Sequence, residues 1–266
     1  MHATVIPRLT RAALLRELAA RGFPRTRRWH ERWIELGLLD RGEQSAGGAY
    51  TWPVTQLELA TTLLTQSAKG ISLGALPKLV VYVWLWWGDA YVPGRQIPRA
   101  MHTWARAEAE APVRRVRVTA AQVAARVAHP RGRARRRLVR ALTDFPARGD
   151  PEDLREAFDA VFDPELRGIE RGPVGAQVST DRYLGLVAAR QRAVANLSRY
   201  TPEQFGAARA LYRRSRAEYA RLQPQYADDA DLGRMHPPVD TNELADAACA
   251  DLLDCLAVLF ERRAVR

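Results

Sequence analysis

The stretch "GFPRTRRWHERWIELGLL", residues 22–39, decides the fold expected for the first part of the chain. Its apolar residues recur at helical spacing and predict one buried face; they are Trp29, Trp33 and Leu36. Thr26 is a suitable N-cap for this helix, and Gly37 suits the left-handed residue that ends it. The opposite stripe is rich in arginine. We therefore expect a helix with one anchored apolar face and one exposed cationic face.

Another helix precedes this stretch, and a hairpin follows it. Thr10 can cap a helix that Gly22 ends, so that only a short turn separates the two helices. The segment "LLDRGEQSAGGAYTW", residues 38–52, places two short apolar runs around a Gly- and Ser-containing loop and so predicts a β-hairpin. Pro53 then opens a further helix, which "KG" at residues 69–70 ends. Helix, tight turn, cationic helix and hairpin are, in this order, the parts of a winged helix-turn-helix.

An apolar run with three tryptophans comes next. Ser72 can cap the helix "LGALPKLVVYVWLWW", residues 73–87. The run is too short to span a bilayer, and contact with the core or with a second copy is the favoured interpretation over membrane or ligand contact. The following "YVPGRQIPRA", residues 91–100, has two prolines and a glycine and predicts a linker.

From Asp150 onward the pattern is helical. The helical stretches are "DPEDLREAFDAVF" at 150–162, "TDRYLGLVAARQRAVANLSRY" at 180–200, "TPEQFGAARALYRRSRAEYARL" at 201–222 and "DTNELADAACADLLDCLAVLFERR" at 240–263. The last one contains both cysteines, Cys249 and Cys255, at a spacing that suits neither a metal site nor a local disulfide. We expect core thiols in a reducing compartment. The start of the chain lacks the pattern of a secretory signal, and no window reaches 18 apolar residues, so a cytoplasmic, nucleoid-associated protein without membrane contact is expected.

Positive charge is concentrated in the first part of the chain. The 266 residues include 41 lysines and arginines against 30 aspartates and glutamates, a formal net charge of +11. Residues 1–100 carry 13 basic and 7 acidic side chains, residues 101–148 carry 12 and 3, and residues 149–266 carry 16 and 20. The cationic part therefore ends near residue 148. Such a balance favours an anionic partner, most often nucleic acid.

Side chains of the cationic helix and the hairpin are the first candidates for contact with nucleic acid. A helix fits the major groove, where its arginines can reach phosphates or guanine edges, and a hairpin can lie against the adjacent backbone. The alternative is an ordinary solvated face, but the regional charge and the element order favour DNA. The candidates are Arg25, Arg27, Arg28, Arg32, Arg41 and Tyr50. His30 is expected to be a surface residue without such a role.

A further arginine cluster lies in "PRGRARRRLVRAL", residues 130–142, with six arginines within ten residues. It is either another phosphate-binding element, for DNA or RNA, or the solvated start of a helix with apolar positions at Leu138, Val139 and Leu142. Arginine clusters add salt-dependent affinity without a fold-specific motif, so both interpretations stay open. The candidates here are Arg131, Arg133, Arg135, Arg136 and Arg137.

About a third of the chain resembles the MerR family of bacterial transcription regulators. The resemblance rests on three stretches that match in order and spacing, namely "LTRAALLRELAARGF", "WIELGLL" and "GGAYTWPVTQLELATTLLTQSAKGISLGALPKLV". They look like the family's first helix, the end of its second helix, and its wing with the paired helix and "G-x-S-L" junction. The resemblance implies a DNA-binding domain over residues 1–90, a dimer, and an effector-binding region farther along.

The chain departs from the family pattern at two places. The family usually has an arginine six residues before the turn glycine, where this chain has Glu31. Its wing commonly carries an arginine before an aromatic pair, whereas residues 49–52 read Ala, Tyr, Thr, Trp. The helix therefore supports phosphate binding more firmly than base recognition. The apolar run at 80–87 or the leucine-rich final helix is expected to supply the dimer contact.

The sequence gives no support for an enzyme. It has no phosphate-binding glycine loop, zinc-ligand spacing or nucleophile elbow, so no catalytic residue, metal or cofactor is expected. We expect a mainly α protein with an N-terminal winged helix-turn-helix and a small β-hairpin wing, residues 1–90. A linker and connecting helix, 91–118, and an all-helical C-terminal domain, 119–266, follow.

This organisation indicates a MerR-like transcription regulator that binds double-stranded DNA as a homodimer. The C-terminal domain is expected to dimerise or to bind a small-molecule effector or a protein partner. The alternative is a protein-interaction or architectural nucleic-acid-binding module that has kept the winged-helix fold.

Overall fold

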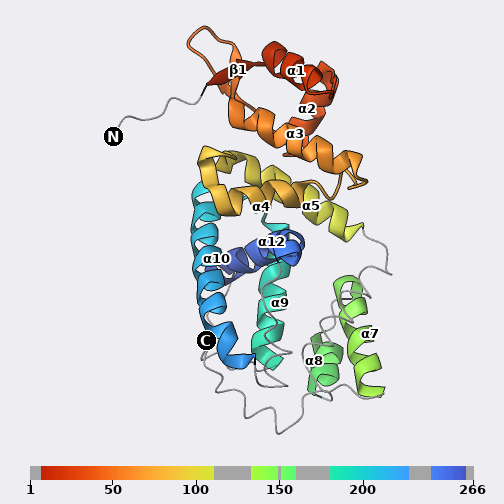
Figure 1. Ribbon diagram of the computed structural model, residues 1–266. Helices are drawn as coiled ribbons and strands as arrows, with labels where there is room; N and C mark the ends of the chain where they lie inside the picture. The colour runs from red at the N-terminus through yellow and green to blue at the C-terminus, as the bar shows by residue number, and fades with distance from the viewer. Residues whose placement is uncertain (1–6, 111–132, 149–150, 160–179, 228–240, 262–266) are drawn as a thin grey trace. The chain divides into compact units, whose positions relative to one another are not determined.

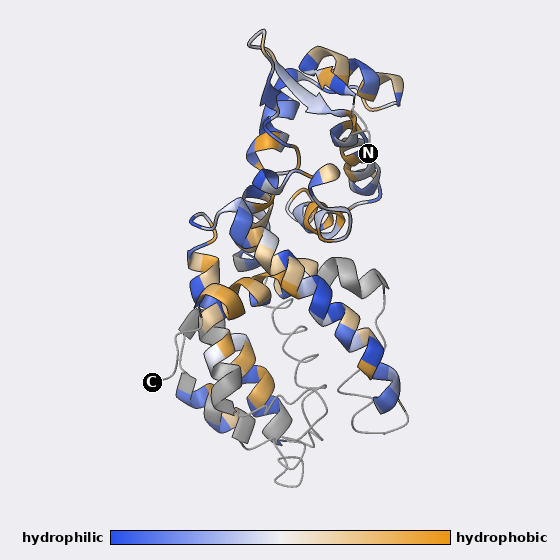
Figure 2. Cartoon of the chain, turned by 90° about the vertical axis from the view of Figure 1, so that its left-hand side faces the viewer, coloured by the Kyte–Doolittle hydropathy of each residue, from blue (hydrophilic) through white to orange (hydrophobic). Residues whose placement is uncertain are grey.

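The computed structural model describes residues 7–110, 133–148, 151–159, 180–227 and 241–261 (Figure 1). In these residues the chain is mainly helical, with a small antiparallel sheet of three strands in the order β1-β3-β2. Two compact units are present, and each is described by itself. The first comprises the described residues of Met1–Ala109, Ala193–Arg216 and Val239–Leu256. Most of the described helices carry both hydrophilic and hydrophobic residues (Figure 2).

The first two helices begin and end where their caps predict. In α1 (Arg11–Ala20) the Thr10 hydroxyl accepts a hydrogen bond from the Ala13 amide at 3.2 Å. In α2 (Arg27–Glu35) the Thr26 hydroxyl accepts one from the Trp29 amide at 3.3 Å. These side chains satisfy amides that have no partner inside the helix. The helix starts expected from the sequence are confirmed.

The hairpin predicted at residues 38–52 is also confirmed. Strand β2 (Glu43–Gln44) pairs antiparallel with β3 (Tyr50–Pro53). The sequence did not predict β1 (Arg8–Thr10), which pairs with the other side of β3 and places Leu9 opposite Trp52. Trp52 is 1% exposed, so the sheet covers one side of the core around α1 and α3 (Val54–Ala68).

The segment between residues 69 and 100 differs from the sequence expectation. The helix α4 (Pro77–Trp87) begins at Pro77, so Ser72 lies in a turn and does not cap it. Residues 91–100, expected to be a linker, form the short turn η2 (Gly94–Gln96) and the start of α5 (Ile97–Ala109). Their apolar side chains are fully buried, namely Val92, Ile97 and Ala100. Because prolines also occur in packed turns, the Pro- and Gly-rich pattern here does not mark an exposed connection.

Parts of two late helices complete the first unit. These are α10 (Pro202–Leu222), up to Arg216, and α12 (Thr241–Leu256), which packs against α4. Arg209 of α10 donates a hydrogen bond to the Leu85 carbonyl at 3.0 Å, at the end of α4. Segments that are far apart in the chain therefore build the first unit together, and the domain bounds 1–90, 91–118 and 119–266 stay a prediction.

Three leucines of α12 belong to the core of this unit. Leu252, Leu253 and Leu256 are at most 1% exposed, which removes them as a free dimer face. The apolar run of α4 is divided, because Val80, Val81, Trp84 and Leu85 are buried while Trp86 and Trp87 are 36% and 59% exposed. Both cysteines are free thiols; Cys249 is buried, as expected of a core thiol, whereas Cys255 is only half-buried.

The second unit includes α7 (Arg133–Arg148), α8 (Pro151–Asp159) and most of α9 (Thr180–Ala195). The helices α7 and α8 pack against each other through Leu138, Ala141, Leu154 and Ala157, which are at most 2% exposed. Arg192 of α9 donates a hydrogen bond to the carbonyl of Glu261 at 2.8 Å, at the end of the π-helical turn η5 (Ala257–Glu261). The helical interpretation of this part of the sequence is confirmed over the described residues.

Candidate nucleic-acid interface

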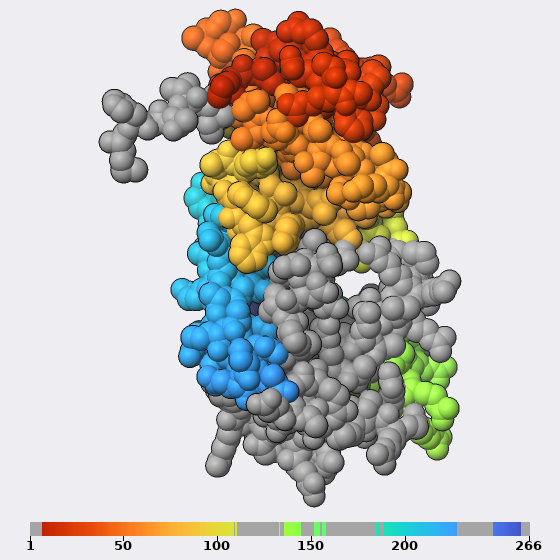
Figure 3. All heavy atoms as spheres, viewed as in Figure 1, coloured from red at the N-terminus to blue at the C-terminus, as the bar shows by residue number. Residues whose placement is uncertain are grey.

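The arginines of α2 form an exposed stripe, as the sequence predicts. Arg27, Arg28 and Arg32 are exposed, and Arg25, just before the helix, is half-buried. The Arg25 guanidinium carbon lies 5.9 Å from the centre of the Trp29 ring, a cation–π geometry that holds this side chain against the helix. The neighbouring hairpin protrudes at the surface beside α1 (Figure 3).

Acidic side chains on α2 already engage some of these arginines. Glu31 lies 2.7 Å from Arg27 Nε and 3.4 Å from Arg11 Nη1, and Arg32 Nη1 lies 3.1 Å from Glu35. The hydrogen bond from Arg27 lowers the pKa of the Glu31 carboxyl. Exposed pairs of this kind contribute little to stability, so a phosphate can replace the carboxylate as partner at small cost.

Arg28 is different from its neighbours. No ion pair or hydrogen bond of its side chain occurs among the described residues, and the side chain is exposed. Its charge is therefore fully available to an anionic partner, whereas the charges of Arg27 and Arg32 are partly neutralised.

The apolar side of α2 fixes the arginine stripe in place. Trp33 and Leu36 are 4% and 6% exposed, which confirms the predicted anchoring face. Trp29 is half-buried and packs against Trp33 with ring centres 4.3 Å apart. Burial of such side chains is worth about 1.5 to 3 kcal/mol each, far more than an exposed ion pair. The core therefore sets which face of α2 meets solvent.

The expectation that His30 is a surface residue is wrong. Its side chain is 0% exposed and meets the Trp52 ring edge to face, with centres 4.7 Å apart. His30 lies on the side of α2 that packs against Trp52 of β3. The spacing of residues within α2 could not predict this contact, because it depends on a distant strand. Burial, and secondarily the charge of Arg11, lowers the pKa of His30 to about 4, so the imidazole is neutral at pH 7.

The hairpin presents its predicted candidates to solvent. Arg41 is exposed in the segment before β2, and Tyr50 at the start of β3 is 51% exposed. On the edge strand, Arg8 donates to the Thr51 hydroxyl and carbonyl, each at 2.9 Å, and lies 2.7 Å from Glu43. Arg8 therefore ties β1 to both hairpin strands.

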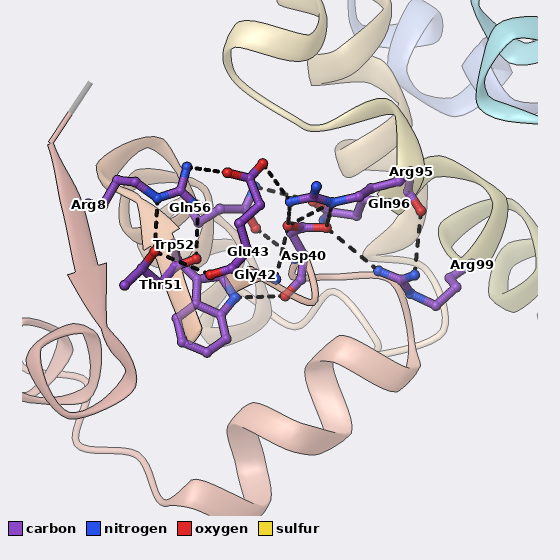
Figure 4. Close-up of polar contacts among 10 residues, drawn as sticks. All are labelled: Arg8, Asp40, Gly42, Glu43, Thr51, Trp52, Gln56, Arg95, Gln96 and Arg99. Atoms are coloured by element: carbon purple, nitrogen blue, oxygen red, sulfur yellow. Dashed lines mark hydrogen bonds and ion pairs between the residues drawn. The ribbon is translucent and has the colours of Figure 1, made fainter. Parts of the chain in front are cut away.

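A buried carboxylate lies at the base of the hairpin (Figure 4). Asp40 is 0% exposed and accepts hydrogen bonds from Arg95 Nε at 3.0 Å and Arg95 Nη2 at 2.6 Å. It also accepts one from the Gly42 amide at 3.0 Å. The hydrogen bond with Asp40 is the main cause that raises the pKa of Arg95. A buried charge requires such partners, because losing one leaves the other uncompensated.

Two buried glutamines extend this network. Gln56 of α3 accepts from the Asp40 amide at 2.8 Å and donates to Gln96 at 3.2 Å. Gln96 in turn donates to the Gly37 carbonyl at 2.9 Å, in the turn after α2. The turn after α2, the hairpin base, α3 and η2 are therefore joined by hydrogen bonds between buried groups.

Sequence reasoning missed this group, because its members are far apart in the chain. Asp40 and Arg95 are separated by 55 positions, and neither belongs to a motif. One local signal was available: the turn sequence "GLL" places residue 40 directly after a buried helix end, where an acidic side chain needs a basic partner.

The arginine cluster at 131–137 belongs to the second unit. Arg131 and the Arg135 side chain lie outside the described residues, while Arg133, Arg136 and Arg137 are exposed. Arg137 forms ion pairs with Asp153 and Glu156 of α8. Of these three exposed arginines, Arg137 is therefore engaged within the unit.

In the described part of the chain, no group of three or more His, Cys, Asp or Glu side chains is arranged to hold a metal ion. No helix there has the length and apolar character needed to cross a membrane. Comparison of the chain with protein-family models, with curated proteins and with solved structures found no match.

Proposed function

We propose that this chain binds double-stranded DNA and acts as a transcription regulator with a MerR-like winged helix-turn-helix. The observation that carries the proposal is the exposed arginine stripe of α2, anchored by Trp33 and followed by a hairpin that presents Arg41 and Tyr50. A helix placed in the major groove would bring the stripe to the phosphates, and the hairpin would meet the adjacent backbone.

In this proposal, phosphate contact supplies most of the affinity. Arg28 is the side chain best placed for it, because its charge is not shared with a carboxylate of the described residues. Glu31 occupies a position where the family usually has an arginine, and it draws Arg27 toward itself. Binding should accordingly depend strongly on salt and modestly on base sequence.

We place the dimer contact of the proposed regulator on the end of α4. Trp86 and Trp87 remain exposed there, whereas Leu252, Leu253 and Leu256 of α12 are buried in the core. Large exposed aromatic side chains side by side are typical of interaction surfaces.

The experiment is a titration of a labelled duplex with the whole chain at several salt concentrations. The proposal expects submicromolar binding at low salt and a logarithmic affinity that falls linearly with the logarithm of salt, with a slope of about −0.9 per phosphate contacted. Lack of binding to any duplex at low salt would contradict it.

The second candidate is a protein-interaction module that has kept the winged fold. The exposed pair Trp86 and Trp87 is the observation that favours it, since this pair would serve a protein partner equally well. Retention on heparin separates the two functions, because a pure protein-interaction module should elute at low salt and a DNA-binding one at moderate salt.

A further inference from the structure

An ion pair between the buried Asp40 carboxylate and the partly exposed Arg95 guanidinium joins η2, the turn before α5, to the hairpin. The Arg95 guanidinium binds the carboxylate of Asp40 through Nε and Nη2, and its Nη2 also lies 3.0 Å from Oε1 of Glu43, the first residue of β2. Arg95 thus holds both Asp40, which precedes the hairpin, and Glu43, which belongs to it (Figure 4).

The other contacts of Asp40 show what this ion pair controls. Its Oδ2 accepts from the Gly42 amide at 3.0 Å, just before β2, and its carbonyl accepts from Trp52 Nε1 at 2.8 Å, on β3. Both strands of the hairpin are therefore tied to residue 40. With the Asp40 carboxylate fixed by Arg95, the hairpin has one position relative to the end of α2.

The backbone of α5 is equally close to that helix end. A Cβ atom at Gly37 would lie 2.3 Å from the Ala100 amide nitrogen, so α5 and the turn after α2 are in direct contact. Arg99 of α5 adds a hydrogen bond to the Ile34 carbonyl of α2 at 3.2 Å. A displacement of α5 would therefore be transmitted to both α2 and the hairpin.

We propose that Arg95 is a positioning residue of the nucleic-acid surface, which fixes the hairpin relative to α2 through Asp40 and Glu43 without itself touching nucleic acid. This inference rests on the proposed function.

The test compares Arg95→Lys with Arg95→Gln in the full chain. Lysine keeps the charge but cannot donate the two parallel hydrogen bonds of the guanidinium group. A phosphate contact would tolerate lysine, whereas a positioning role would not. The two readouts are duplex affinity and, without DNA, the hydrogen-exchange rate of the Gly42 amide together with the indole NMR signal of Trp52.

Both variants are expected to lower duplex affinity about fivefold to tenfold and to raise Gly42 exchange at least tenfold. Arg213→Gln, which removes the same charge from an exposed position of α10, serves as the control and should change neither quantity by more than about twofold. Wild-type affinity and exchange in Arg95→Lys would overturn the proposal.

Loss of Arg95 alone leaves a buried carboxylate without its cation, which could unfold the unit. The double variant Asp40→Asn with Arg95→Gln removes both charges and keeps an amide at each position. The proposal expects this folded variant to show the same fast Gly42 exchange and weaker duplex binding, and slow exchange would overturn it. If the wild-type chain binds no duplex, the proposed function fails, and with it the role in binding, while the exchange rates still decide whether Arg95 holds the hairpin.

Discussion

Glu31 and Arg27, one turn apart on α2, form an ion pair with 2.7 Å between Oε1 and Nε. This pair places a negative charge within the proposed DNA-binding stripe and partly neutralises one of its arginines. Replacing Glu31 by glutamine should free Arg27 and raise duplex affinity about twofold to fivefold at low salt, since an exposed pair is worth up to about 1 kcal/mol.

The measurement is the dissociation constant for one duplex over a range of salt concentrations. Glu17→Gln removes a charge of the same sign from an exposed position of α1 and is the matched control. Glu31→Arg, which replaces the negative charge by a positive one, should exceed the gain of Glu31→Gln. Equal gains in the Glu17 and Glu31 variants would show that only net charge matters.

Gly37 should be among the least replaceable residues of the first unit. Its φ is +71°, and a Cβ atom there would collide with the backbone of Ala100 at 2.3 Å. We expect Gly37→Ala to lower the free energy of unfolding by roughly 3 kcal/mol or more, because backbone strain adds to displacement of α5.

Gly22 provides the control for that prediction. It has φ of +84° but nothing within 4 Å of the added Cβ atom, so Gly22→Ala carries only the cost of the left-handed conformation, about 1 to 2 kcal/mol. Urea unfolding of both variants measures the difference. Similar losses for the two alanine variants would refute the close approach of α5 to residue 37.

His30 should make the protein sensitive to mild acid. Burial lowers its pKa to about 4, whereas in the unfolded chain it is near 6.5, so the unfolded state takes up the proton first as pH falls. The stability that comes from keeping His30 neutral is complete above about pH 6.5. It declines as the pH falls from 6.5 to 4 and stays constant below pH 4. The shift corresponds to about 3 kcal/mol, as an order of magnitude.

The difference in unfolding free energy between the wild type and His30→Phe isolates this effect from the titration of carboxylates. Between pH 7.5 and pH 4.5, the wild type should lose about 2 to 3 kcal/mol more unfolding free energy than His30→Phe does. A constant difference between these pH values would mean that His30 is accessible to water in the folded protein.

The sequence predicted those parts of the fold that local patterns determine. Thr10 and Thr26 cap the helices where expected, and Trp33 faces the core, because cap chemistry and helical periodicity act over a few residues. It did not predict β1, whose three residues are a strand only because they pair with Pro53, Trp52 and Thr51, more than 40 positions away.

The same distinction applies to the candidate interface. The exposed arginines of α2 could be identified from spacing alone. The buried position of His30 and the packed turn at Arg95 could not, since each depends on a partner in another element, Trp52 and Asp40 respectively. A Pro- and Gly-rich segment has the same composition whether it is a linker or a turn held by an ion pair.

Charge reversal of Arg28 and Arg32 tests whether α2 binds duplex DNA through its exposed arginines. The control is reversal of Arg213 and Arg214, an equally exposed pair on α10 that changes net charge by the same amount. Duplex affinity at several salt concentrations is measured for both double variants. We expect Arg28→Glu with Arg32→Glu to weaken binding at least tenfold and to flatten the salt slope by about two phosphate contacts, while the α10 variant retains the wild-type slope. Unchanged affinity and an unchanged salt slope in the α2 variant would contradict it.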